Sequence, residues 1–182
     1  MFRRFRNRAL QSNPLGPIQL RTLNQANQLM AGGQPAQAAP LYAELAAELE
    51  GTNHPRRAAN LHAQAAHAFA DSQNGQAALS HARAALALFL QYQMVRRTPV
   101  FYANITRKLN SKGMKNIAES LEKEFGSQVG PMPAPVAPPA GQHGQLPTNC
   151  PKCGAPIHAN EANWVDVSTV ECDFCGSLIR PE

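Results

Sequence analysis

The chain has 182 residues, of which 6% are aromatic and 16% charged, and it carries a formal net charge of +5. This length can hold one ordinary domain, or one modest domain and a very small one that needs something other than a core to hold it together. Few aromatic residues and abundant alanine argue against a β-sandwich or a large enzyme core and favour closely packed helices. No window approaches 18 uninterrupted apolar residues. We therefore expect a cytoplasmic protein with neither a secretion signal nor a membrane span, and no membrane partner.

The first segment, residues 1–16, reads as a basic arm. Arg3, Arg4, Arg6 and Arg8 are accompanied by no acid up to residue 13. Such a run can contact phosphates or an anionic membrane surface, although it is too short to anchor a protein by itself. The alternative interpretation is a solvated, disordered arm.

The second segment, residues 17–125, reads as a helical repeat domain. Three similar stretches begin at Gly33, Gln73 and Gly113, which are evenly spaced along the chain. Each follows an amphipathic segment and opens another, which predicts the turn of an antiparallel helical hairpin. The expected helices span roughly 18–31, 35–50, 55–71, 76–93, 99–111 and 114–125.

Small residues and prolines refine this prediction. Alanine recurs at the same place in each repeat, at positions 38, 78 and 118, where a small side chain lets paired helices approach closely. Pro40 falls about one turn into its expected helix and should start that helix late or bend it. Thr98 stands directly before Pro99, which predicts that Thr98 caps the fifth helix.

The repeat region resembles the tetratricopeptide family. The residues that carry the resemblance are Ala26-x-x-Leu29-x-x-x-Gly33-x-x-x-x-Ala38-x-x-x-Tyr42, together with the Ala-Leu-Ser-His-Ala-Arg-Ala-Ala-Leu run at 78–86. The repeat of that family is shorter than the interval between Ala38, Ala78 and Ala118, so we interpret this chain as a variant with longer helices. The resemblance implies a concave groove that binds a peptide or a partner protein.

The third segment, residues 126–148, reads as a linker. It contains six prolines among glycine, alanine and glutamine, at positions 131, 133, 135, 138, 139 and 147. Such a composition cannot bury enough apolar surface to fold by itself.

The last segment, residues 149–182, carries two Cys-x-x-Cys pairs, Cys150 with Cys153 and Cys172 with Cys175, separated by 18 residues. Each pair on a tight turn can present both sulfurs to one tetrahedral ion, and the glycine that follows permits the left-handed backbone of that turn. Four thiolates close the coordination shell, which predicts structural Zn²⁺ rather than a catalytic metal or a redox dithiol. The segment resembles a zinc ribbon, with β-type alternation over 164–170 and folding that depends on the metal. We interpret His158, a spare candidate ligand, as a surface residue.

The predicted fold is thus mainly α, with antiparallel helical-hairpin repeats and a small β zinc ribbon. We expect a non-catalytic scaffold or adaptor with a protein or peptide partner, in which self-association could cover the open ends of the stack. No paired-carboxylate, nucleophile or glycine-rich phosphate motif supports an enzyme. His62 and His67 share a predicted helix, but a spacing of five does not place both on one face.

The alternative function is nucleic-acid binding or regulation through the basic arm and the basic helical surface. The candidate residues are Arg56, Arg57, Arg96, Arg97, Arg107 and Lys108. The ribbon opposes this function, since its five acidic and two basic side chains would repel phosphates. The same opposite charges suggest that the ribbon folds back on the basic helical region in a salt-sensitive contact.

Overall fold

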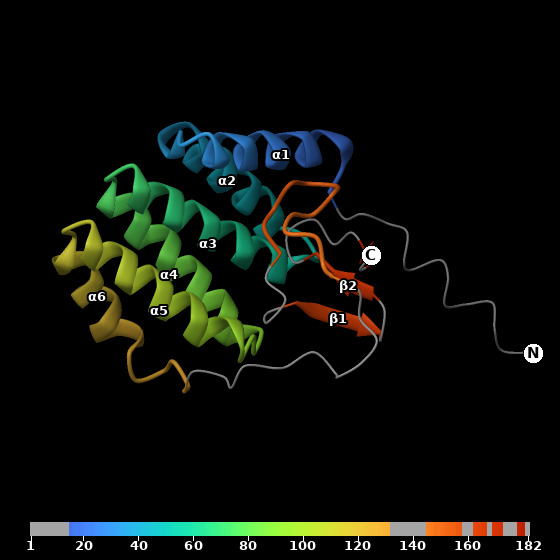
Figure 1. Ribbon diagram of the computed structural model, residues 1–182. Coiled ribbons are helices and arrows are strands. Elements are labelled where there is room, and N and C mark those ends of the chain that lie inside the picture. The colour runs from blue at the N-terminus through green and yellow to red at the C-terminus, as the bar shows by residue number, and fades with distance from the viewer. Residues whose placement is uncertain (1–14, 132–144, 158–161, 167–168, 173–177, 181–182) are drawn as a thin grey trace, which may run out of the picture.

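The computed structural model describes residues 15–131, 145–157, 162–166, 169–172 and 178–180 (Figure 1). Most of the described chain is helical. The helices are α1 (Pro17–Ala31), α2 (Pro35–Glu50), α3 (Pro55–Asp71), α4 (Gly75–Gln91), α5 (Arg97–Ser111) and α6 (Lys115–Phe125). They lie within about two residues of the expected ranges, so the mainly α fold is confirmed.

Proline fixes where three of these helices begin. Pro17, Pro35 and Pro55 each occupy the first helical position. A proline there loses nothing, because the first N–H groups of a helix have no partner inside the helix. The sequence therefore marks the starts of α1, α2 and α3 locally, before any tertiary contact is considered.

The turns after α1, α3 and α5 have the same backbone geometry. Gly33, Gln73 and Gly113 have positive φ angles of 70°, 63° and 79°. In each turn the N–H of this residue bonds a carbonyl three residues back, and the next N–H bonds a carbonyl five residues back, at 2.8–3.2 Å. This is the Schellman termination, which satisfies the last helix carbonyls. The three turns thus share one geometry at even spacing along the chain, and the same termination also follows α4, where Gln93 has a φ of 51°.

The helices stack in sequence order, with α1 and α2 at one end and α5 and α6 at the other (Figure 1). Each helix packs on the next one, and α3 also packs on α5 and α4 on α6. Helix α3 is central, and seven of its alanines are buried: Ala58, Ala59, Ala63, Ala65, Ala66, Ala68 and Ala70. Alanine on several sides of one helix allows several neighbours to approach it closely.

Two details of the helix ends differ from expectation. The predicted Thr98 cap is wrong, because α5 begins at Arg97 and the Thr98 hydroxyl donates to the carbonyl of Met94 at 3.0 Å. Pro99 still lies in the first turn, where its missing N–H has no cost, so the helix can start before it. Of the two outcomes expected from Pro40, a late start or a bend, the late start is excluded, since α2 begins at Pro35 and includes Pro40.

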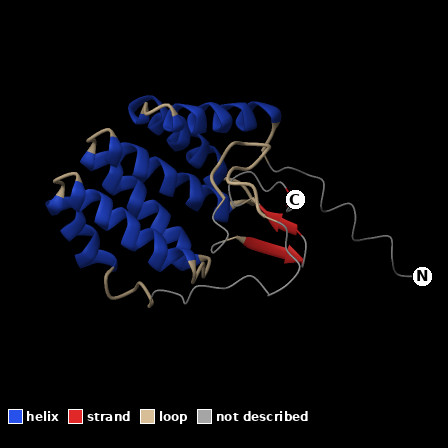
Figure 2. Ribbon diagram, in the orientation of Figure 1, coloured by secondary structure: helices blue, strands red, loops and turns tan. Residues whose placement is uncertain are grey.

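The described part of the last segment forms a small antiparallel sheet. Its strands are β1 (Asn163–Asp166), β2 (Thr169–Glu171) and β3 (Leu178–Ile179), in the order β1-β2-β3. Residue 164 pairs with Val170, and Val170 pairs with Ile179. Figure 2 shows β1 and β2 gathered at one side of the helical stack. The described residues of the expected β-type alternation over 164–170 thus lie in two antiparallel strands.

The ribbon, by which we mean the described residues from Asn149 onward, shares a core with the first helices. One buried cluster joins Leu23 of α1 and Tyr42 of α2 with Cys150, Cys153 and Ile179. A second buried cluster joins α3, α4, α5 and α6. The four-segment division of the chain stays an interpretation, but the ribbon packs directly against the helices. None of the described helices is long and apolar enough to cross a bilayer.

The repeated turn yields a stability prediction. Gln73 holds a left-handed backbone that glycine occupies in the other two turns, so Gln73→Gly should stabilise the protein by about 1 kcal/mol. The matched change Gly113→Ala should destabilise it by a similar amount, because a Cβ there meets nothing within 4 Å and only backbone strain counts. Urea unfolding measures both. A loss of stability in Gln73→Gly would contradict this account of the turn.

Candidate metal centre

Three of the four predicted ligands come together in the structure. Cys150, Cys153 and Cys172 have sulfur atoms that all lie within 4.8 Å of one another, and all three side chains are buried. Cys150 and Cys153 belong to the loop before the sheet, and Cys172 follows β2. The fold therefore brings Cys172 back to the first pair. Cys175 and His158 lie outside the described residues.

The spacing of the sulfurs fits a thiolate shell. Cys153 Sγ and Cys172 Sγ are 3.8 Å apart, which is too far for a disulfide bond. Zinc–sulfur bonds of about 2.3 Å in a tetrahedron place neighbouring sulfurs roughly 3.8 Å apart. Three buried thiols with no metal would be an inert apolar cluster, whereas as thiolates they need a cation to offset their charge. The donor set and its geometry thus fit a metal ion.

The backbone around the first cysteine pair is a tight turn closed by hydrogen bonds. The N–H of Gly154 donates to the carbonyl of Cys150 at 2.8 Å, and the N–H of Cys150 donates to the carbonyl of Ala155 at 2.8 Å. Gly154 has a φ of +72°, which confirms the left-handed backbone expected after this pair. We call residues 149–156 the first knuckle.

The first knuckle is hydrogen-bonded to helix α1. Asn27 Nδ2 donates to the carbonyl of Cys153 at 2.6 Å, and Tyr42 Oη donates to Asn27 Oδ1 at 2.6 Å. The Tyr42 side chain is 1% exposed, so this chain of bonds reaches into the core of the first hairpin. Burial, and then the charge of Cys153, raise the pKa of Tyr42 above its usual range, which keeps the phenol a donor.

A second asparagine, one turn earlier on the same face of α1, lies against the knuckle. Asn24 Nδ2 donates to the carbonyl of Lys152 at 3.3 Å. A Cβ added to Gly154 would lie 3.0 Å from Asn24 Oδ1, so glycine is needed here for close approach as well as for its φ angle. The described contact consists of amide–carbonyl bonds and buried apolar surface, and the acidic side chains of residues 149–182 lie outside the side chains that the structure describes.

Sequence reasoning did not identify Asn24 and Asn27. Their spacing of three places them on one face of α1, but polar residues on a helix face are ordinarily solvated. The one available signal was weak: Asn27 lies one helical turn after Leu23, which is buried. Without knowledge of the ribbon's position, that side cannot be recognised as a docking surface.

A cavity of about 620 Å³ lies between the helices and the ribbon. On its helical side Asn60, Gln64 and His67 face it from α3, at spacings that share one side of a helix. The apolar residues of the helical side are Met30, Ala63, Phe89, Val100 and Phe101. Its ribbon wall is apolar and consists of Pro156, Ile157, Ala162, Val170 and Cys172. The cavity is therefore bounded by both parts of the protein.

Cations line the α5 side of this cavity. They are Arg97, Arg107, Lys108 and Lys112, and no acidic side chain is among the described lining residues. Lys108 and Lys112 pair with Asp71 beside the cavity, at 2.6 Å and 3.4 Å. The predicted basic helical surface thus has part of its charge, at Arg97, Arg107 and Lys108, directed at this cavity.

His67 lies in the wall with an unsatisfied ring nitrogen. Its Nδ1 is inaccessible to solvent and has no hydrogen-bond partner among the described residues. The ring meets Phe101 edge to face, with centroids 5.4 Å apart. Burial, reinforced by Lys108 and opposed by Asp71, lowers the pKa of His67 to about 4. The imidazole is consequently neutral at pH 7.

His62 lies on another side of α3, as its spacing from His67 predicted. Its Nε2 is 2.8 Å from Glu50 Oε1, and its Nδ1 is 2.8 Å from His81 Nδ1. Burial lowers the pKa of both histidines, although Glu50 opposes the shift. These contacts tie α2, α3 and α4 together away from the cavity.

Comparison with protein-family models, with curated proteins and with solved structures finds no match for this chain.

The docking contacts predict unequal effects of two asparagine substitutions. Asn27→Ala removes a donor from the Cys153 carbonyl and an acceptor from the Tyr42 hydroxyl, so it should cost about 2 kcal/mol of folding stability. Asn24→Ala, the control on the same face, removes one exposed bond and should cost less than about 1 kcal/mol. Urea unfolding at a fixed zinc concentration measures both, and equal costs would contradict the proposed role of Asn27.

The environment of His67 predicts a pH dependence. Its folded pKa of about 4 lies below the ordinary histidine value of about 6.5, so in this window the unfolded chain binds the proton and the folded chain does not. The contribution of this group to stability is full above about pH 6.5 and should fall by roughly 3 kcal/mol as the pH drops to about 4. The difference in unfolding free energy between the unsubstituted protein and His67→Gln should therefore change between about pH 6.5 and about pH 4. A difference that stays constant over this range would contradict the lowered pKa of His67.

Proposed function

We propose that this protein is a cytoplasmic, non-catalytic interaction scaffold that binds a protein or peptide partner. The observation that carries the proposal is the cavity lined by α3 and α5 on one side and by the ribbon on the other. Because the first knuckle is hydrogen-bonded to α1, the helices and the ribbon present one surface to a partner. Binding would then need the ribbon in place, which gives its metal a structural role.

We further propose that the helices are a tetratricopeptide-like variant and that the ribbon holds one Zn²⁺ on Cys150, Cys153, Cys172 and Cys175. Three evenly spaced turns of the same geometry support the repeat assignment. The sulfur spacing of the three described cysteines supports zinc, and Cys175 completes the thiolate set by its place in the sequence. When bound, zinc supplies the cross-link that so small a sheet lacks.

Nucleic-acid binding is the second candidate, and the cations on α5 favour it. Arg107, Lys108 and Lys112 line one side of a cavity that a single strand could enter. The apolar ribbon wall and the acidic composition of residues 149–182 favour a protein partner instead. In either case binding should weaken with salt, so salt dependence alone does not separate the two candidates.

A pull-down from nuclease-treated native lysate separates them. The bait is the full chain loaded with zinc, because truncation after Phe125 would uncover the core that α1 and α2 share with the ribbon. Its metal content should be one zinc per chain, and Cys153→Ser should reduce it. The intact bait should retain a defined protein that Asn27→Ala, with its loosened ribbon, retains less well.

The outcomes assign the function. A protein recovered by the intact bait, and weakened by Asn27→Ala but not by the control Asn24→Ala, supports the scaffold. Material recovered only when nuclease is omitted transfers the function to nucleic acid. Recovery of nothing under either condition overturns both.

A further inference from the structure

Two histidines outside the cavity meet through their ring nitrogens. His62 of α3 and His81 of α4 have Nδ1 atoms 2.8 Å apart. The ring centroids are 5.1 Å apart, farther than these nitrogens, so the rings approach each other through their Nδ1 edges. A hydrogen bond between two neutral imidazoles needs one donor and one acceptor, so the tautomer of one ring determines that of the other.

Glu50 determines which ring nitrogen of His62 carries the proton. Its Oε1 lies 2.8 Å from His62 Nε2. A carboxylate only accepts hydrogen bonds, so Nε2 of His62 carries the proton and Nδ1 presents a lone pair. His81 Nδ1 must then donate to that lone pair. The three residues thus form a chain in which each hydrogen bond fixes the next tautomer.

The histidine pair is held in place but is open to solvent on the side of His81. The His62 side chain is 7% exposed, whereas His81 is half-buried. Phe69 stacks on the His81 ring, with centroids 5.3 Å apart and an angle of 12° between the planes. Because burial lowers the pKa of both histidines, both rings are neutral at pH 7, which is the form that binds metal ions.

The geometry of the pair is close to that of two zinc ligands. A histidine that binds a metal through one ring nitrogen almost always donates its other N–H to a partner such as a carboxylate, and Glu50 accepts that bond from His62. Two nitrogens bound to Zn²⁺ at about 2.0–2.1 Å in a tetrahedral shell lie about 3.3 Å apart. The two Nδ1 atoms need to separate by only about 0.5 Å, which small side-chain rotations supply.

We infer that His62 and His81 bind a Zn²⁺ ion through their Nδ1 atoms, with Glu50 orienting His62. The inference goes beyond the proposed function and does not depend on it. The ion takes the place of the proton between the rings: His81 releases the proton of Nδ1 to water and gains one from water at Nε2, so both imidazoles stay neutral. Water completes the coordination shell on the exposed side, and the ion cross-links α3 and α4.

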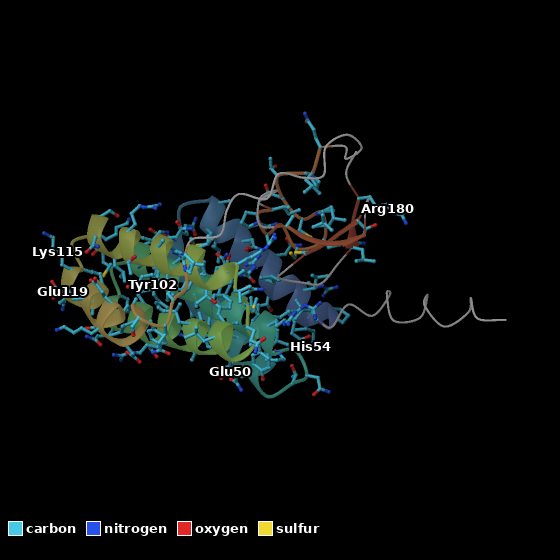
Figure 3. The ribbon with its side chains drawn as sticks, turned by 90° about the horizontal axis from the view of Figure 1, so that it is seen from below. Glu50, His54, Tyr102, Lys115, Glu119 and Arg180 are labelled. Atoms are coloured by element: carbon cyan, nitrogen blue, oxygen red, sulfur yellow. The ribbon has the colours of Figure 1, made fainter. Side chains whose placement is uncertain are left out.

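This second site is separate from the cysteine cluster. Figure 3 shows Glu50 on the side of the helices away from Arg180, which marks the ribbon. The two sites can therefore be filled and counted one after the other.

Titration of the full chain with Zn²⁺ tests this inference. The starting protein contains one zinc per chain by metal analysis, so the cysteine site is already filled. Calorimetry near neutral pH should then detect one further equivalent, bound more weakly than the first because it has two imidazole ligands in place of thiolates. Ring-nitrogen NMR should place the His81 proton on Nδ1 before the addition and on Nε2 after it.

Matched variants separate metal binding from hydrogen bonding. In His81→Gln the amide can still donate to His62 Nδ1 but offers no ring nitrogen, so the further equivalent should bind at least about tenfold more weakly. Glu50→Gln should weaken it by about tenfold, because the carboxylate no longer orients the His62 ring. The control is His54→Gln, at the residue before α3, where Nδ1 lies 3.3 Å from Arg57 Nη1. It should bind zinc as the unsubstituted protein does.

The inference is overturned if no further equivalent binds, or if His81→Gln binds it as tightly as the unsubstituted protein. A His81 proton that stays on Nδ1 at saturating zinc would overturn it as well. The pull-down tests the proposed function separately, since Glu50, His62 and His81 are not among the described residues that line the cavity.

Discussion

The bond between Asn27 and the Cys153 carbonyl fixes where the ribbon lies. Tyr42 holds the Asn27 amide from the other side, and its hydroxyl is buried in the first helical hairpin. A side-chain amide held at both ends has one orientation, so the first knuckle takes its position from the core of the helices. The cavity between the helices and the ribbon exists because the ribbon is held against α1 and not elsewhere along the stack.

This docking also explains how so small a sheet persists. Its described strands have four, three and two residues, which cannot form an adequate core. Two outside contributions replace that core. The cysteine cluster has a geometry that fits a metal ion, which would cross-link the loops of the sheet. The apolar surface of α1 and α2 packs against the ribbon and buries Ile179. The ribbon is thus stabilised by its neighbours as well as by its ligands.

The helical stack shows how a repeated local signal gives a regular scaffold. The same turn follows α1, α3 and α5, and alanine is buried at positions 38, 78 and 118 immediately after it. Helix α3 departs from this regularity: it is buried on several sides because α2, α4 and α5 all pack on it. The two histidines of α3 face different neighbours for that reason. His62 contacts α2 and α4, and His67 faces the cavity between the helices and the ribbon.

The sequence by itself determined the helices and the cysteine cluster. Proline at the first helical position, a left-handed turn at regular intervals and apolar spacing are local signals, and they place the six helices within about two residues. Cysteine spacing identified the cluster for the same reason, since ligand geometry at a knuckle is local. The Thr98 cap failed because two start signals competed over a few residues, and the turn that begins at Met94 prevailed.

Only the tertiary structure decided how the ribbon meets the helices. Asn24 and Asn27 lie far along the chain from the knuckle they bind, and nothing in their local sequence distinguishes them from solvated asparagines. The opposite charges of residues 149–182 and the helices suggested contact, and the described part of that contact uses neutral amides and buried apolar groups. Long-range contacts of this kind depend on which surfaces meet after the helices have formed, and no periodicity in the sequence encodes that.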